Sequence, residues 1–225
     1  MRIAVAKGDG IGPEIMDAVL TIFNANQVPL EYAFVDMGKW VFDKGFSDGM
    51  TPEARHSIEE LGLLFKGPME TPKGKGVKSI NVTARKTWNT YANNRVFQSL
   101  HGVDTVFSRA GINIDLTVVR ENIEDTYGGI EHMLTHDVAL SRRFITRPGS
   151  LQVIRYAFLM AKQKHAKRIT CGHKANIMKL TDGLFLECFY EVSKEFPELK
   201  ADDVIVDDLC MKLVTRPDNF DVIYV

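Results

Sequence analysis

Short apolar runs alternate with amphipathic segments along this chain, and that alternation is typical of an α/β fold with a largely parallel sheet. Behind Pro13, which the first turn of a helix tolerates, apolar side chains recur at helical spacing. We expect strands at 2–6, 30–34, 63–65, 114–119, 168–172, 203–207 and 221–225. We expect helices from residue 13, at 52–61, near 81–93, at 150–165 and at 178–195, and a short one after 207. Residues 131–147 lack a helical period and are expected to form a β-hairpin arm.

The composition is that of an ordinary globular protein of one large or two small domains. The chain has 225 residues, of which 45% are hydrophobic and 25% charged. Its net charge of −1 gives no reason to expect nucleic acid or an acidic membrane surface as a partner. No leader and no apolar run of ~20 residues is visible, so we expect a cytoplasmic protein. The cysteines, Cys171, Cys188 and Cys210, lack metal-ligand spacing and are expected to be reduced core thiols.

A spread of polar side chains suits a small, multiply charged carboxylate. A guanidinium holds a carboxylate with two parallel hydrogen bonds, which lysine does not reproduce. The candidate substrate-binding residues are Ser79, Asn81, Arg85, Arg95 and Arg120. Ser79 and Asn81 stand at an expected helix start, where they equally suit helix capping. Arg120 closes an expected strand, at the end where open α/β sheets bind ligands, although any one arginine alone could be a solvated surface residue.

Two further residues suit proton transfer. Tyr127 offers a phenol seven residues after Arg120, and the alternative is a packed aromatic side chain. Lys174 follows another expected strand, and an ammonium group close to the phenol would lower its pKa. The neighbouring His173 is expected to be structural. Asp207 ends the next strand and offers a hard oxygen ligand for Mg²⁺ or Mn²⁺, which is a weak signal without partner carboxylates.

The segment Gly8-Asp-Gly-Ile-Gly-Pro13 lies between an expected strand and an expected helix, as a dinucleotide-binding turn does. It does not match that motif, because the third glycine comes one residue early and Pro13 occupies the position of the last glycine. Two interpretations stay open, a tight structural turn and a turn that lines a ligand cleft.

Several motifs in a fixed order make the chain resemble the isocitrate/isopropylmalate dehydrogenase family. They are Gly8–Glu14, Gly67–Pro72, Ser79–Arg85, Tyr91–Arg95, Arg120–His132 and His173–Lys179. The resemblance covers the whole chain and implies an isopropylmalate dehydrogenase-like α/β fold with two domains and a mixed, largely parallel sheet. Ser79 and the Arg-Glu-Asn-Ile-Glu-Asp-Thr-Tyr run at 120–127 favour isocitrate over isopropylmalate as substrate.

By that resemblance, Ser79, Asn81, Arg85, Arg95 and Arg120 hold isocitrate. Tyr127 protonates the enol after decarboxylation, and Lys174 helps remove the hydroxyl proton in a neighbouring subunit's site. Glu70, Thr71 and Asn176 lie near the nicotinamide of NAD or NADP, and Asp207 ligates Mg²⁺ or Mn²⁺. The resemblance further implies a homodimer with shared active sites, in which the arm at 131–147 forms the dimer clasp.

The chain also departs from the family pattern. Val96 replaces the proline usual after the Arg95 position. The family continues past the strand at 221–225 into a segment with two more metal-binding aspartates, followed by segments that bind the adenosine half of the cofactor. We therefore expect residues 1–100 to be a first domain that lacks its C-terminal half, and residues 101–225 to be the second domain.

Such a chain is expected to be inactive alone, and its sequence does not choose between NAD and NADP. Two alternatives stay open. The chain is a non-catalytic subunit or dimerisation module of such an enzyme, or it belongs to a related decarboxylating dehydrogenase, such as one that acts on homoisocitrate.

Overall fold

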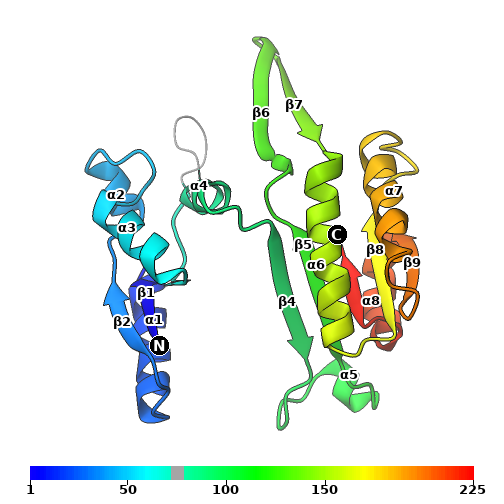
Figure 1. Ribbon diagram of the computed structural model, residues 1–225, viewed down its shortest axis with the longest axis horizontal. Helices are drawn as coiled ribbons and strands as arrows, with labels where there is room; N and C mark the ends of the chain where they lie inside the picture. Colours follow the sequence, from blue (N-terminus) through cyan, green and yellow to red (C-terminus); the bar gives the residue numbers. More distant parts are fainter. Residues whose placement is uncertain (72–78) are drawn as a thin grey trace. The chain divides into compact units, whose positions relative to one another are not determined.

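The structure, a computed structural model, describes residues 1–71 and 79–225 and falls into two compact units (Figure 1). The first unit is Met1–Trp88 and the second is Asn89–Val225. The boundary lies at Trp88 rather than near residue 100, because the strand that follows pairs within the second unit. No helix among the described residues is long and apolar enough to cross a membrane.

The first unit is built on a parallel three-stranded sheet in the order β2-β1-β3. Its strands are β1 (Arg2–Ala6), β2 (Glu31–Phe34) and β3 (Leu64–Lys66). Its helices are α1 (Gly12–Ala25), α2 (Lys39–Asp43), α3 (Pro52–Leu61) and α4 (Ile80–Thr87). Successive residues of β1 point to opposite faces, so Ile3 and Val5 pack against α1 while Ala6 packs with residues of α3 and α4.

Local sequence signals set the limits of these helices. Thr51 caps α3, because its side chain accepts a hydrogen bond of 3.1 Å from the Ala54 amide, and Pro52 occupies the first turn. Gly62 ends α3 in the left-handed conformation, at φ 67°. The expected helix over 52–61 is therefore confirmed.

The second unit contains a five-stranded sheet in the order β4-β5-β10-β8-β9. Its strands are β4 (Ala92–Gln98), β5 (Asp115–Glu121), β8 (Arg168–His173), β9 (Lys200–Ile205) and β10 (Val222–Tyr224). Its helices are α5 (Val106–Arg109), α6 (Arg147–Gln163), α7 (Thr181–Ser193), α8 (Val206–Thr215) and the 3₁₀ turn η1 (Pro217–Asn219). The strands run parallel except β4, which pairs antiparallel with β5, so the predicted mixed, largely parallel sheet is confirmed.

The largest core lies between this sheet and the pair α6 and α7. Phe158 of α6 and Phe189 of α7 are fully buried, with ring centroids 5.3 Å apart. Tyr224 of the central strand stacks on Phe185 at 4.5 Å. Helix α8 joins a smaller core through Leu209, which packs with Ile223. These cores fix the ends of the strands, and the candidate site residues of the second unit lie at those ends.

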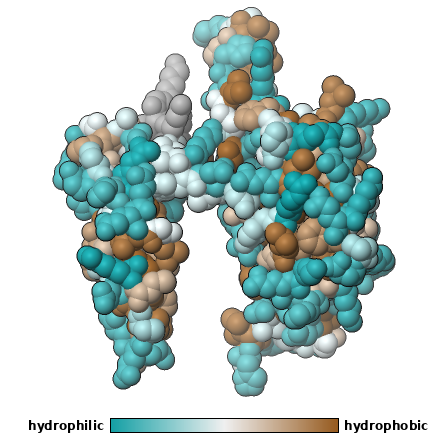
Figure 2. All heavy atoms as spheres, viewed as in Figure 1, coloured by the Kyte–Doolittle hydropathy of each residue, from teal (hydrophilic) through white to brown (hydrophobic). Residues whose placement is uncertain are grey.

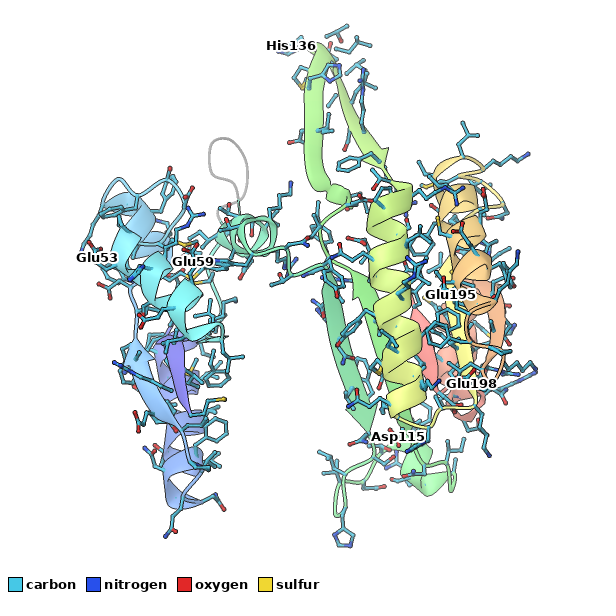
Figure 3. The ribbon with its side chains drawn as sticks, viewed as in Figure 1. Glu53, Glu59, Asp115, His136, Glu195 and Glu198 are labelled. Atoms are coloured by element: carbon cyan, nitrogen blue, oxygen red, sulfur yellow. The ribbon has the colours of Figure 1, made fainter. Side chains whose placement is uncertain are left out.

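A two-stranded hairpin projects from the second unit (Figure 1). It consists of β6 (Asp125–Thr135) and β7 (Val138–Phe144), with His136 at its tip (Figure 3). Met133 and Leu134 are about 60% exposed, and brown apolar atoms are visible on this arm in Figure 2. The hairpin expected over 131–147 is present and begins earlier, at Asp125.

The structure corrects two expected elements. The helix predicted near 81–93 ends at Thr87, because Asn89 takes a left-handed backbone conformation with φ 46°, and residues 92–98 form β4. The strand predicted at 203–207 is Lys200–Ile205, so Asp207 lies in the first turn of α8 and not on a strand.

Candidate active site

The carboxyl ends of the first unit's strands are joined by one carboxylate, that of Asp9. Its oxygens accept hydrogen bonds from the backbone amide of Lys39, at 2.8 and 2.9 Å, and from that of Glu70, at 2.9 Å. The Asp9 amide in turn donates to the Pro68 carbonyl at 2.8 Å. Asp9 therefore fixes the loops after β1, β2 and β3 relative to one another.

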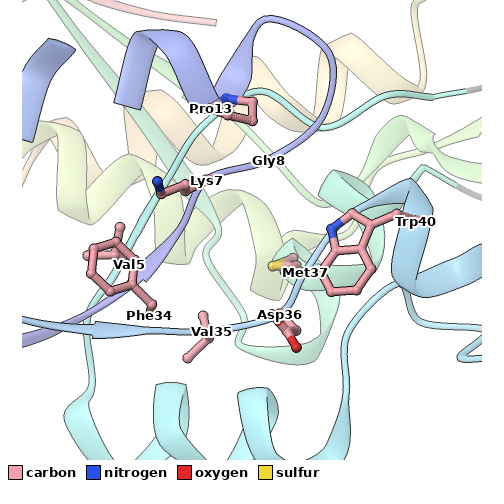
Figure 4. A pocket seen from close by; sticks show the side chains of 9 residues that line it. All are labelled: Val5, Lys7, Gly8, Pro13, Phe34, Val35, Asp36, Met37 and Trp40. Carbon is pink, nitrogen blue, oxygen red and sulfur yellow. The ribbon is translucent and has the colours of Figure 1, made fainter. Parts of the chain in front are cut away.

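The glycines of the same motif allow these loops to touch. A Cβ atom on Gly8, whose φ is 83°, would lie 2.2 Å from the Pro68 carbonyl oxygen, and one on Gly67 would lie 2.1 Å from that of Lys7. Beside them is a pocket of about 400 Å³ lined by Lys7, Pro13, Asp36 and Trp40, among others (Figure 4). The segment from Gly8 to Pro13 is thus a tight turn that also lines a pocket, which combines the two interpretations left open by the sequence.

Helix α4 carries the polar residues of the first unit. Ser79 precedes the helix, yet its hydroxyl makes no capping bond and lies 3.1 Å from the Thr71 hydroxyl. The buried Oδ1 of Asn81 has no hydrogen-bond partner among the described residues. The Ser79 hydroxyl is therefore not used as a helix cap, and the Asn81 oxygen lacks a partner among the described residues. Thr71 and Glu70 are exposed, whereas Pro72, the last residue of their motif, lies outside the described residues.

Positive charge gathers next to these groups. Arg85 is half-buried on α4, and Lys66 at the end of β3 has a lowered pKa because burial, and then the nearby charge of Arg85, disfavour its ammonium form. Two cations at close quarters are stabilised by an anion between or beside them. The first unit thus brings Ser79, Asn81 and Arg85 together in an environment that suits a carboxylate.

In the second unit, Arg120 lies over the ring of Tyr127. Its guanidinium carbon is 5.3 Å from the ring centroid, a cation–π arrangement. Its Nη2 donates to Asn122 Oδ1 at 3.3 Å, whereas its buried Nε has no hydrogen-bond partner among the residues described. This buried donor is therefore left without a partner in the part of the chain that the structure describes.

Arg95 lies on the neighbouring strand, on the same face of the sheet. In the antiparallel pair β4–β5, Asn93 is opposite Arg120, and Arg95 is two residues further along β4. The exposed Arg95 side chain donates through Nε to Asn93 Oδ1 at 3.1 Å. The second unit therefore brings Arg95, Arg120 and Tyr127 together.

Two acidic residues between Arg120 and Tyr127 shape the loop rather than bind ligands. The buried Glu121 accepts hydrogen bonds from the amides of residues 122, 123 and 124 through one carboxylate oxygen, and burial raises its pKa. Glu124 accepts from the Thr146 amide at 2.8 Å, which ties the loop to the start of α6. The motif at 120–127 thus contains two carboxylates whose hydrogen bonds fix the loop.

Lys174 and Asp207 form an ion pair at the carboxyl edge of the same sheet. Lys174 directly follows β8, and Asp207 follows the adjacent parallel strand β9. The Lys174 amide also donates to the buried carboxylate of Asp182, at 2.6 Å. Asn176 lies in the turn after Lys174 and is exposed.

His173 is used within the fold. Its Nδ1 accepts from the Ala175 amide at 3.0 Å, and its Nε2 lies 2.9 Å from Asp203 Oδ2. Tyr190 donates to the same carboxylate, and these two hydrogen bonds lower the pKa of Asp203 although its burial opposes the change. Both ring nitrogens are occupied, as a structural histidine requires.

The described residues do not complete a metal site. Among them, no three His, Cys, Asp or Glu side chains are grouped so that they could hold an ion. Asp207 is a single carboxylate whose ammonium partner, Lys174, competes with any cation. The described residues therefore contain no complete set of protein ligands for a metal ion.

Comparison with known proteins identifies the family. The model of the family "Isocitrate/isopropylmalate dehydrogenase" matches residues 2–225. The chain belongs to this family. The chain is 44% identical to the NADP isocitrate dehydrogenase of Thermus thermophilus over 221 aligned residues. The alignment covers 98% of this chain and 44% of that protein. A solved structure of protein TT0538 from the same organism has a TM-score of 0.94 at 43% identity and covers 99% of this chain and 45% of that one.

Relatives with other names are nearly as similar. The chloroplastic 3-isopropylmalate dehydrogenase of Solanum tuberosum is 43% identical over 223 residues, 99% of this chain and 61% of that protein. The mitochondrial catalytic subunit 5 of NAD isocitrate dehydrogenase from Arabidopsis thaliana is 43% identical over 216 residues, 96% of this chain and 56% of that protein. The chain thus spans about half the length of these dehydrogenases, and overall identity does not separate their substrates or cofactors.

Sequence reasoning missed several residues that position the site. Asp9 is one of them, because a lone carboxylate between glycines carries no signal of its partners at Lys39 and Glu70. Asp182 and Arg143 were missed because a buried ion pair between distant segments leaves no local pattern. Asp182 lies in the first turn of α7, where an acidic side chain is favoured, and this position was the one hint of a structural role.

Proposed function

We propose that these residues serve the NAD- or NADP-dependent oxidative decarboxylation of isocitrate to 2-oxoglutarate. The observation that carries this proposal is the polar start of α4, where the Ser79 hydroxyl is unused as a cap and the buried Asn81 Oδ1 is unpaired among the described residues. A hydroxyl group of the substrate can donate to the Asn81 oxygen and the Ser79 hydroxyl can donate to a substrate carboxylate, whereas an isopropyl group can do neither. Isocitrate therefore fits better than isopropylmalate.

The binding roles follow from charge. Arg85, Arg95 and Arg120 would neutralise the carboxylates of isocitrate through their guanidinium groups. The exposed Glu70, Thr71 and Asn176 would contact the nicotinamide portion of the cofactor. The cofactor, when bound, accepts a hydride from the carbon that bears the hydroxyl group.

Two residues would move protons. Lys174, held beside Asp207, would help to take the proton from the substrate's hydroxyl group, and Tyr127 would donate a proton to the carbon that loses carbon dioxide. The cation–π contact with Arg120 orients the Tyr127 ring for that donation. Asp207 would supply one ligand of a Mg²⁺ or Mn²⁺ ion, and among the described residues no group of three His, Cys, Asp or Glu side chains completes a site.

The test is a titration of the 225-residue protein with isocitrate, 3-isopropylmalate and homoisocitrate, followed by NMR, with intact mass measured on the same sample. We expect isocitrate to shift resonances of Arg120, Tyr127 and Asn81 at lower concentration than the other acids. Stronger binding of isopropylmalate or homoisocitrate would transfer the proposal to that substrate. With a divalent cation and either cofactor we expect no robust turnover, because the metal site is incomplete among the described residues.

A second candidate function is favoured by the β6–β7 hairpin. Its exposed apolar side chains, among them Ile130, Met133 and Leu134, suit the clasp of a homodimer or pairing with a longer subunit. In that case the chain would lend Lys174 and Asp207 to a partner's site. Co-expression with a full-length relative that carries a substitution at its equivalent of Lys174 should then restore activity. Failure to pair with that relative would exclude this function.

A further inference from the structure

The two candidate arginines of the second unit are each held by the side-chain amide of an asparagine. Arg95 Nε donates to Asn93 Oδ1 at 3.1 Å, and Arg120 Nη2 donates to Asn122 Oδ1 at 3.3 Å. In each pair the two residues are two positions apart in the sequence, so along an extended strand their side chains point to the same face. The same arrangement therefore occurs once on β4 and once at the end of β5.

These four side chains lie on one face of the sheet. Asn93 is directly opposite Arg120 in the antiparallel pair β4–β5. Asn122 comes directly after β5, and its backbone amide extends the pairing by donating to the Tyr91 carbonyl at 3.1 Å. Arg95 and Arg120 therefore share their face of the sheet with both asparagines.

The orientation of the Asn122 amide is set by its two neighbours. Asn122 is 5% exposed, and its Nδ2 donates to the Thr90 carbonyl at 2.8 Å, so Oδ1 is the atom that faces Arg120. An aspartate in this position would place an oxygen against the Thr90 carbonyl. The buried amide thus gives a donor to one neighbour and an acceptor to the other, which a carboxylate cannot do.

Carboxylates are close to Arg120 in the sequence but are used elsewhere. The side-chain oxygens of Glu121, Glu124 and Asp125 accept hydrogen bonds from backbone amides. In the part of the chain that the structure describes, the hydrogen-bond partners of the Arg95 and Arg120 side chains are the two asparagine amides and no carboxylate. Both arginines therefore keep their positive charge beside a segment rich in acidic residues.

We propose that Asn93 and Asn122 are positioning residues that hold the guanidinium groups of Arg95 and Arg120 without neutralising them. The charge is then kept for the carboxylates of a substrate, and the geometry is set before the substrate binds. This inference rests on the substrate-binding roles in the proposed function. A carboxylate in place of either amide would hold its arginine more tightly, because a charged hydrogen bond is the stronger one. It would also repel an incoming carboxylate a few ångströms away.

The experiment compares Asn93→Asp and Asn122→Asp with Asn94→Asp in the whole 225-residue protein. Asn94 is the matched control, because it is adjacent to Asn93 on β4 but its side chain points to the other face of the sheet. There its Nδ2 donates to the Tyr156 hydroxyl at 3.4 Å. NMR titration measures the affinity for isocitrate. Hydrogen exchange of the Arg95 Nε proton reports how firmly that guanidinium is held.

We expect Asn93→Asp to weaken isocitrate binding by about tenfold, because the new carboxylate lies next to the bound anion. The same variant should slow exchange of the Arg95 Nε proton, because its acceptor has become charged. Asn94→Asp should change the affinity by no more than about twofold, since Asn94 is exposed and solvent screens its charge.

The two readouts separate positioning without neutralisation from a merely structural role. Aspartate has the shape of asparagine and keeps the acceptor for Arg95, so a structural role would leave isocitrate affinity unchanged in Asn93→Asp. An unchanged affinity in that variant overturns the proposal, and so does an equal loss in Asn94→Asp. Asn122→Asp should also weaken binding by about tenfold. If Asn122→Asp does not fold, Asn93→Asp alone decides, because Asn93 is only half-buried and on an edge strand.

Failure of this proposal differs from failure of the proposed function. If isocitrate does not bind the unsubstituted protein, the proposed function is removed, and the same variants are titrated with citrate, a tricarboxylate of different shape. A loss of citrate affinity of about tenfold in Asn93→Asp but not in Asn94→Asp would still support the role of the asparagines. Absence of binding by both acids would overturn both proposals.

Discussion

The ammonium group of Lys174 and the carboxylate of Asp207 form an ion pair, although their strands β8 and β9 end at positions more than thirty residues apart in the chain. Their side chains are 28% and 68% exposed, respectively. In such a position an ion pair adds at most about 1 kcal/mol to stability. The ion pair therefore matters less for stability than for the proposed chemistry, because Asp207, the candidate metal ligand, is paired with Lys174, the candidate base.

Competition between Lys174 and a metal ion can be tested directly with Mn²⁺. Lys174→Met removes the competing ammonium and should strengthen the paramagnetic broadening of resonances around Asp207. Asp207→Asn should abolish that broadening, because a neutral amide is a poor ligand for a hard cation. Broadening that is equal in both variants would show that Mn²⁺ binds elsewhere, and Asp208→Asn serves as the control for charge loss in the same helical turn.

Asp9 should be far more important for stability than an ordinary surface aspartate. In Asp9→Asn, an NH2 group replaces one of the two oxygens that now accept the Lys39 amide, so in either orientation of the side chain two donors face each other. We expect a loss of about 2 kcal/mol in the free energy of unfolding, the typical penalty for leaving such donors without partners. Urea unfolding measures the change.

Asp17→Asn is the matched control for that experiment. Asp17 pairs with Lys7 at 2.7 Å, but its side chain is 59% exposed, so its loss should change stability by less than about 0.5 kcal/mol. Equal effects of the two substitutions would mean that Asp9 does not hold the three loops together.

Gly67→Ala should destabilise the first unit because the new methyl group has no room. Its Cβ would lie 2.1 Å from the Lys7 carbonyl oxygen, which belongs to the backbone and cannot turn aside. Gly183→Ala is the control, since Gly183 is in helix α7 and a Cβ there meets nothing within 4 Å. That variant should gain up to about 1 kcal/mol from helix propensity. Thermal unfolding that moved both variants in the same direction would contradict the close contact of the two loops.

A pH-dependent effect is expected at Glu121. Burial raises the pKa of this carboxyl group, so the folded state binds its proton more tightly than the unfolded state does. Its contribution to stability is therefore largest at low pH and is lost as the pH rises from the ordinary glutamate value through the folded value. Because Glu121→Gln cannot ionise, the unsubstituted protein should lose stability relative to this variant across that range.

Glu198 provides the control of opposite sign. A hydrogen bond from Lys162 lowers the pKa of Glu198, which lies between α7 and β9 and is labelled in Figure 3. The unsubstituted protein should therefore gain stability relative to Glu198→Gln as the pH rises through the acidic range. Urea unfolding at a series of pH values measures both variants, and slopes of the same sign would refute the assignment at Glu121.

The sequence was informative wherever a local pattern decides the structure. Apolar periodicity located α3, α6 and α7, since their buried faces repeat at helical spacing. Strand β4 was missed because Tyr91–Gln98 is polar and exposed at an edge of the sheet, and because the helix before it ends at Asn89 without glycine or proline. The boundary near residue 100 was misplaced for the same reason, as β4 belongs with β5.

Candidate site residues are easier to propose from the sequence than the residues that position them. The chemistry of the Arg120 guanidinium and the Tyr127 phenol can be read from the residue types alone, and the structure brings the two groups into contact. The contacts of Asp182 with Lys174 and Arg143 depend on three segments meeting in space. Nothing in the sequence near position 182 specifies those partners, so tertiary structure was needed to reveal them.

Substitution of Ser79 tests whether its hydroxyl group binds a ligand or caps helix α4. Its hydroxyl makes no capping bond to α4, so Ser79→Ala should change the free energy of unfolding by less than about 0.5 kcal/mol, whereas loss of a true cap costs about 1 kcal/mol. Thr51→Ala is the matched control, because Thr51 does cap α3. Isocitrate binding should weaken by about tenfold in Ser79→Ala through loss of a hydrogen bond to a charged group, and it should be unaffected in Thr51→Ala. Urea unfolding and NMR titration measure the two effects, and a Ser79→Ala protein that loses stability but binds isocitrate normally would assign Ser79 to the helix rather than to the substrate.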